Sequence, residues 1–153
     1  MVSVYDVAGN IYHRYQKAYG ERIDEMKLHK LMYFAQRESL IQNDEPLFNA
    51  TFYGWKYGPV LKEIRHMYRT DSFEDVKDAQ KISVIQPIVD TVFDLYAAKD
   101  SWSLSRLTHG ETSWKNSRVG IAEDENSDTP IKIDDIRLDA AKVKLRRQLL
   151  AQL

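Results

Sequence analysis

The sequence predicts a mainly α-helical, compact single domain over residues 1–153, with one small β element near residues 48–57. Three observations favour this fold class. Apolar residues recur at helical spacing along most of the chain. Residues that cap helices stand before several of these segments. One short aromatic run is typical of a strand. A chain of 153 residues without internal repeats has the usual length of one domain.

The first two helices are marked by their ends. The spacing predicts one helix from about residue 4 to residue 19, with Ser3 as its N-terminal cap and Gly20 after its last turn. A second helix follows Asp24 and continues to about residue 41. Its apolar residues cover a wider arc than one contact face needs, so we expect it to lie at the centre of the domain. These residues are Leu28, Leu31, Met32, Phe34, Ala35 and Ile41.

The predicted β element is unusually aromatic. Within ten residues it contains Phe48, Phe52, Tyr53, Trp55 and Tyr57. Residues 51–57 are expected to form a strand that turns at Gly58 into a helix beginning at Pro59. Such a density of rigid aromatic groups indicates either a packed sub-core or a recognition surface, because aromatic residues dominate the energetics of both.

The second half of the chain predicts shorter elements. A short helix near 73–80 is expected within a polar stretch, then a helix over 86–99. Two short helices follow, capped by Ser101 and Thr112, and then an acidic loop at 123–130. A last helix begins at Asp134, and we expect its apolar face to pack on the core. That face consists of Leu138, Ala141, Leu145 and Leu149.

Composition excludes several classes of protein. The chain has no cysteine, so disulfides, thiolate catalysis and iron–sulfur clusters are excluded. It shows no signal peptide and no apolar run of about 20 residues that could span a membrane, so a cytoplasmic location is expected. The net charge of −1 argues against a broad nucleic-acid footprint. The basic stretch at 142–147 is interpreted as a solvated helix face, and the alternative is a contact for an acidic or RNA-like partner.

Catalytic constellations are not found. No pair of the four histidines has the spacing of a zinc motif, and neither a nucleophile elbow nor a phosphate-binding loop is present. We therefore expect no enzyme activity, no cofactor and no metal. The acidic loop is interpreted as solvated, and the alternatives are that it mimics nucleic acid or engages a basic partner surface.

Three ordered motifs carry a family resemblance. They are KLHKLMYFAQ at 27–36, PLF at 46–48 and FYGWKYGPV at 52–60. A later segment with Leu104, Leu107, Thr108, His109 and Trp114 completes the pattern. Together these motifs resemble the Panacea domain, the family of SocA-like antitoxins and phage-associated proteins, over about residues 4–140. Gly54 departs from the pattern, which usually has alanine before the tryptophan.

The resemblance implies a binding function that requires no catalysed reaction. It implies a small helical domain that neutralises a cognate toxin by direct binding, as the antitoxin of a toxin–antitoxin module, often on a prophage. The alternative is an adaptor that delivers a partner to a protease, or a phage-associated regulatory module. The predicted contact residues are Tyr33, Trp55, Lys56, Tyr57 and Trp114, and burial in the core is the competing interpretation for each.

Overall fold

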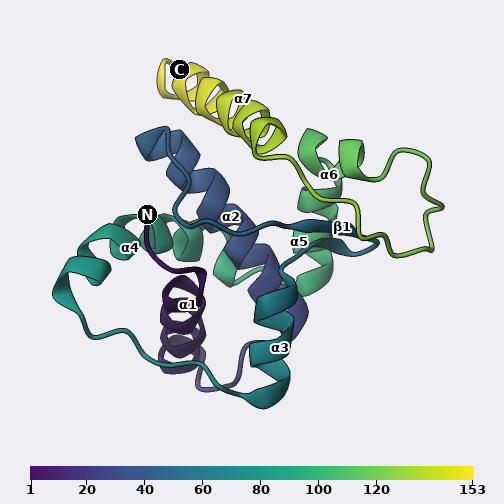
Figure 1. The fold of residues 1–153 in the computed structure, drawn as a ribbon. Helices are drawn as coiled ribbons and strands as arrows, with labels where there is room; N and C mark the ends of the chain where they lie inside the picture. The colour runs from purple at the N-terminus through teal and green to yellow at the C-terminus, as the bar shows by residue number, and fades with distance from the viewer.

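The computed structural model describes residues 1–153 and confirms the mainly helical fold class. A single two-stranded antiparallel sheet accompanies the helices and lies to one side of the molecule (Figure 1). The elements are α1 (Val4–Tyr19), α2 (Glu25–Asn43), β1 (Tyr53–Trp55), β2 (Gly58–Val60), α3 (Lys62–Thr70), α4 (Ala79–Val92), the π-helical turn η1 (Phe93–Ala97), α5 (Ser101–His109), α6 (Thr112–Ser117) and α7 (Ile133–Ala151).

Helix α2 is the central element, as its wide apolar arc predicts. Fifteen of its nineteen residues are buried. It contacts α1, α3, α4, α5, α7 and β2, and Figure 1 shows it passing through the middle of the molecule. The helix also buries the polar residues Lys27, His29, Arg37 and Glu38. Buried polar groups need hydrogen-bond partners, and each of these four side chains has one.

Polar side chains of α2 attach the last two helices to the core. The Tyr33 hydroxyl lies 2.7 Å from Ser113 Oγ in α6. Glu38, which is almost fully buried, accepts two hydrogen bonds from the Arg147 guanidinium of α7 at 2.8 and 3.0 Å. Asp139 of α7 accepts the backbone N–H groups of Thr112 and Ser113, both at 2.8 Å, and so caps α6 from another helix.

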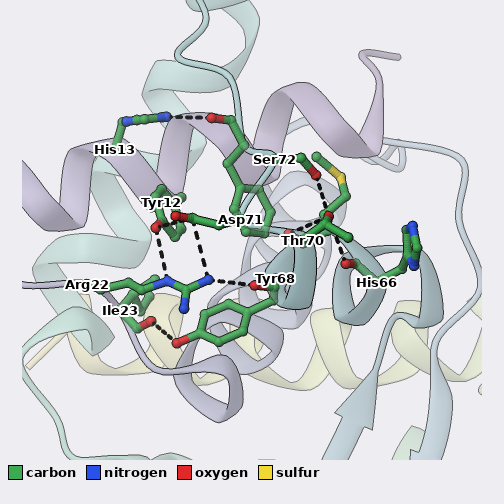
Figure 2. Close-up of polar contacts among 11 residues, drawn as sticks. Tyr12, His13, Arg22, Ile23, His66, Tyr68, Thr70, Asp71 and Ser72 are labelled. Carbon is green, nitrogen blue, oxygen red and sulfur yellow. Dashed lines mark hydrogen bonds and ion pairs between the residues drawn. The ribbon is translucent and has the colours of Figure 1, made fainter.

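A polar cluster joins α1 to the end of α3 (Figure 2). Arg22, in the loop after α1, donates to the Tyr12 hydroxyl at 3.0 Å and lies 3.5 Å from Asp71. Tyr12 donates to the same Asp71 carboxylate at 2.7 Å. The guanidinium of Arg22 also stacks over the Tyr68 ring at 3.8 Å, and the Tyr68 hydroxyl donates to Ile23 O. The cluster therefore fixes the loop between α1 and α2 against α3.

The predicted caps at Ser3, Gly20 and Asp24 are confirmed, and α2 continues two residues beyond its predicted end, to Asn43. Ser3 accepts the N–H of Tyr5, and Gly20 has a φ of 72° after the last turn of α1. Asp24 accepts the N–H of Lys27 at the start of α2. The later helices begin one or two residues before the predicted positions. Asp100, not Ser101, caps α5 with its side chain, whereas Glu111 and Lys132, the residues before α6 and α7, make no capping bond.

Three predictions for individual elements are wrong. No helix forms over 73–78, because Asp78 caps α4 and that helix begins at Ala79 instead of residue 86. Pro59 does not begin a helix, because Gly58–Val60 pairs with β1 and α3 starts only at Lys62. The expected core face of α7 is also wrong. Leu138, Leu145 and Leu149 are exposed, and the opposite face of α7 packs inward.

Candidate protein-binding surface

The β hairpin places its two loop residues, Lys56 and Tyr57, at the surface. Trp55 pairs with Gly58 across the turn, so the loop has two residues. Gly58 has a φ of 129°, a backbone region that favours glycine. A Cβ atom at this position would lie 2.9 Å from Thr108 Oγ1 and 3.4 Å from Lys30 Nζ. The turn therefore depends on glycine for both its conformation and its close packing.

Side chains of α5, of α6 and of the residue after α6 donate hydrogen bonds to the backbone of the hairpin on its buried side. Trp114 Nε1 donates to Trp55 O at 2.8 Å, and Ser105 Oγ donates to Tyr57 O at 3.0 Å. Arg118, just after α6, donates to the carbonyl oxygen of Gly54 at 3.0 Å. These three bonds satisfy backbone carbonyls that the two short strands leave free, and they make the hairpin a rigid support for its loop.

The exposed aromatic side chains beside this loop come from two elements. Tyr57 is 45% exposed and Trp102, in the first turn of α5, is 57% exposed. Their rings meet edge to face, with centroids 5.5 Å apart and an interplanar angle of 88°. The Lys56 ammonium lies 5.1 Å from the centre of the Tyr57 ring. With His109 these residues line a shallow hollow of about 540 Å³, and we call Lys56, Tyr57, Trp102 and His109 the hairpin patch.

The rim of the hairpin patch is acidic on one side. Glu123 and Asp124, at the start of the acidic loop, line the same hollow. Asn126 in that loop accepts the backbone N–H of Lys56 at 3.1 Å. The loop therefore contacts the hairpin directly, and its carboxylates lie beside the exposed aromatic rings.

His109 belongs to the rigid side of the patch. Its ring stacks on Trp114 with centroids 4.1 Å apart and an interplanar angle of 13°. Burial lowers the pKa of His109, and the positive charge of Lys30 lowers it further. The ring is therefore favoured in its neutral form, which suits a stacking platform better than a proton-transfer group.

The five predicted contact residues separate into three environments. Lys56 and Tyr57 lie in the hairpin patch, whereas Trp55 and Trp114 are half-buried beneath it. Tyr33 is fully buried, so its prediction as a surface contact is corrected. Its hydroxyl bonds to Ser113, and burial raises its pKa well above the usual value. Tyr33 is a structural residue of the α2–α6 interface.

Trp102 is the exposed aromatic residue that the sequence reasoning missed. A signal for it exists in the spacing of α5, whose buried residues are Leu104, Ser105 and Thr108. Trp102 lies two residues before Leu104 and thus on the opposite side of the helix. A tryptophan on the polar side of a short helix indicates a surface role.

The arrangement defines a helical domain with a rigid aromatic patch, a construction typical of protein-binding surfaces. Residues 28–115 match the model of the antitoxin SocA-like, Panacea domain, and the chain belongs to this family. Neither a curated protein nor a solved structure matches the chain. No group of three or more His, Asp or Glu side chains is placed to hold a metal ion, and none of the helices is long and apolar enough to cross a membrane.

Proposed function

We propose that this protein is an antitoxin that neutralises its toxin by direct binding through the hairpin patch. The observation that supports this most is the pairing of Tyr57 and Trp102, two half-exposed rings from different elements that meet beside a rigid hairpin. Aromatic anchors of this kind supply most of the binding energy of protein interfaces. Membership in an antitoxin-like family supports a toxin protein as the partner.

The proposed mechanism is occlusion. The folded domain covers the active site or the substrate surface of the toxin, and no chemical step is required. Glu123 and Asp124 beside the patch favour a toxin whose contact surface is basic, because complementary charge speeds and orients association. Trp55 and Trp114 contribute indirectly, since they hold the loop residues in position.

The test is a growth assay with the product of the adjacent reading frame. That product is expressed alone, with this protein, and with a variant in which Tyr57 and Trp102 are both replaced by serine. We expect growth arrest, rescue and loss of rescue, respectively. The matched control is Tyr5→Ser, because Tyr5 is 48% exposed but lies on α1, away from the hairpin.

Binding measured with the purified proteins separates contact from folding. Each serine substitution should weaken binding by about 2 kcal/mol, or about 30-fold in Kd, if the ring anchors the interface. The variants should keep the circular-dichroism melt of the wild type, because both rings are half-exposed. Full rescue by the double variant would refute the patch as the contact site.

The abundance of the partner in the same cells distinguishes occlusion from delivery to a protease. Occlusion predicts that toxin levels hold steady or rise when this protein is present. An adaptor function predicts that they fall, and that they recover when the protease is removed. A harmless neighbouring product would instead favour a regulatory module.

A further inference from the structure

A second surface, on the other side of Arg106, has a different chemistry. A groove of about 480 Å³ lies between α7 on one side and η1, α5 and the start of α6 on the other. Leu95 and Leu107, each 44% exposed, line it together with Arg106, Lys142 and Arg146. We call these five residues the basic groove. Arg106 also lines the hairpin-patch hollow, so the two surfaces adjoin there.

The three cations of the basic groove have no carboxylate partner. Arg106 donates only to Ser103 Oγ and Lys142 only to Thr112 Oγ1, and Arg146 takes part in none of the ion pairs of the structure. The protein as a whole has a net charge of −1, so this is a local excess of positive charge. Unpaired cations around exposed leucines indicate a surface suited to an acidic ligand.

The two carboxylates that line the groove are already engaged by the protein. Glu111 forms an ion pair with the buried Arg37. Asp139 accepts the N–H groups at the start of α6 and the Tyr33 hydroxyl. These acidic groups therefore stabilise the fold at the bottom of the groove and do not neutralise the cations at its rim.

An apolar ridge on α7 extends this surface. Leu138, Leu145 and Leu149 are 54%, 56% and 57% exposed. Their spacing of seven and four residues places them along one side of the helix. We call these three residues the leucine ridge, and Figure 1 shows α7 along the edge of the molecule. Lys142 and Arg146 follow Leu138 and Leu145 by four and one residues, so cations lie between the ridge and the groove.

We propose that the basic groove and the leucine ridge together bind an acidic amphipathic segment of a partner protein, with its apolar side chains on the leucines. The charges favour this occupant over a second copy of the chain. Lys144 lies on the other side of the ridge from Lys142 and Arg146, so cations flank the leucines on both sides. Two copies joined through their ridges would bring like charges together, which is destabilising.

The proposal is independent of the toxin and of the hairpin patch. Its probe is a fluorescein-labelled 20-residue helical peptide with leucine on one face and glutamate on the others. Two control peptides replace all glutamates by lysine or all leucines by serine. Binding is measured by fluorescence anisotropy in about 150 mM salt, which is the physiological ionic strength. The Glu–Leu peptide should bind at least about tenfold more tightly than either control.

Two double variants locate the binding, one in the basic groove and one in the leucine ridge. Lys142→Glu with Arg146→Glu should weaken the Glu–Leu peptide at least about tenfold, and Leu145→Ser with Leu149→Ser should do the same. The control Lys77→Glu with Lys99→Glu makes an equal charge change at exposed lysines outside the groove and should have little effect. Circular-dichroism melts establish that all variants fold, and the hairpin variant Tyr57→Ser with Trp102→Ser should bind the peptide as the wild type does.

Five results would overturn the proposal. The Glu–Leu peptide fails to bind, or the lysine peptide binds as tightly. The groove variants and the Lys77 and Lys99 control weaken binding equally, which indicates a general charge effect. Light scattering finds a dimer that the Leu145 and Leu149 substitutions abolish, which assigns the ridge to a second copy. Inorganic pyrophosphate displaces the peptide competitively at submillimolar concentration, which assigns the groove to a small anion.

Discussion

Replacing Lys30 by methionine is expected to stabilise this protein at neutral pH. Lys30 lies in α2 directly beneath the hairpin, 2% exposed, and its Nζ makes no hydrogen bond or ion pair. Burial lowers the pKa of this ammonium from 10.5 to about 8, with a smaller opposing effect from Asp24. Methionine has a similar length and no charge, so it removes the desolvation cost and keeps the packing.

The size of the gain follows from the pKa. Since a change of one in pKa corresponds to about 1.4 kcal/mol, lowering the pKa of Lys30 to about 8 costs the folded state about 3 kcal/mol at pH 7. Part of that gain is lost to imperfect packing, so we expect about 1–3 kcal/mol, or about 3–9 °C in Tm. Between pH 8 and 10.5 the folded lysine is neutral while the unfolded lysine stays charged, so the wild type gains stability and the advantage of methionine shrinks.

Lys27→Met is the matched control. Lys27 is also buried on α2, at 7% exposure, but its Nζ donates to Ala97 O at 3.1 Å and to the Tyr15 hydroxyl at 3.3 Å. Removing it leaves a buried carbonyl unpaired and should destabilise the protein by about 1–3 kcal/mol. Urea denaturation at pH 7 and pH 9.5 measures both variants. A loss of stability in Lys30→Met, or a gain that does not change with pH, would refute the reasoning.

Three further predictions test other parts of the fold. Gly58→Ala should cost about 2–3 kcal/mol by urea denaturation, because the Cβ would enter occupied space at positive φ, whereas Gly120→Ala, at positive φ in open space, should cost about 1 kcal/mol. Burial lowers the pKa of His29, so the free energy of unfolding is highest above about pH 6.5 and falls as the pH decreases below it. His29→Gln should flatten this pH dependence between about pH 7.5 and 5.5, and equal slopes of unfolding free energy against pH in the wild type and the variant would contradict it. Trp114→Phe removes the hydrogen bond to Trp55 O and should lower stability by about 1 kcal/mol while toxin neutralisation persists, because Trp114 supports the hairpin from below.

Local signals in the sequence predicted the elements that local chemistry determines. Ser3, Gly20 and Asp24 mark helix ends through bonds to residues within a few positions, and such bonds can be read from the chain. The wide apolar arc of α2 predicted its central position, because the spacing of apolar residues along one helix is also visible in the local sequence. Asp78 could have been identified in the same way, since it precedes the apolar residues of α4 and bonds to the next N–H groups.

Contacts between distant residues were beyond these signals. The cap of α6 is Asp139, more than twenty residues later in the chain, so no local pattern announces it. Tyr33 was predicted as a contact residue, yet its hydroxyl lies beside Ser113, eighty residues later in the chain, and no local pattern indicates this buried contact. Of the candidate surface, the sequence predicted the hairpin residues Lys56 and Tyr57 and missed Trp102, whose partner ring belongs to another element.

The orientation of α7 shows why periodicity alone chose the wrong face. The helix has two apolar faces: one includes Ile136 and Ala140, the other includes the leucine ridge. Burying the three leucines of the ridge instead would gain about 2–5 kcal/mol, since each is already about half-buried and a fully buried leucine contributes about 1.5–3 kcal/mol. It would also turn Arg147 away from the buried Glu38 and Asp139 away from α6. An unpaired buried carboxylate costs about 3–5 kcal/mol and a lost cap about 1–2 kcal/mol. The two polar anchors therefore determine which face packs, and the leucines stay exposed and available to a partner.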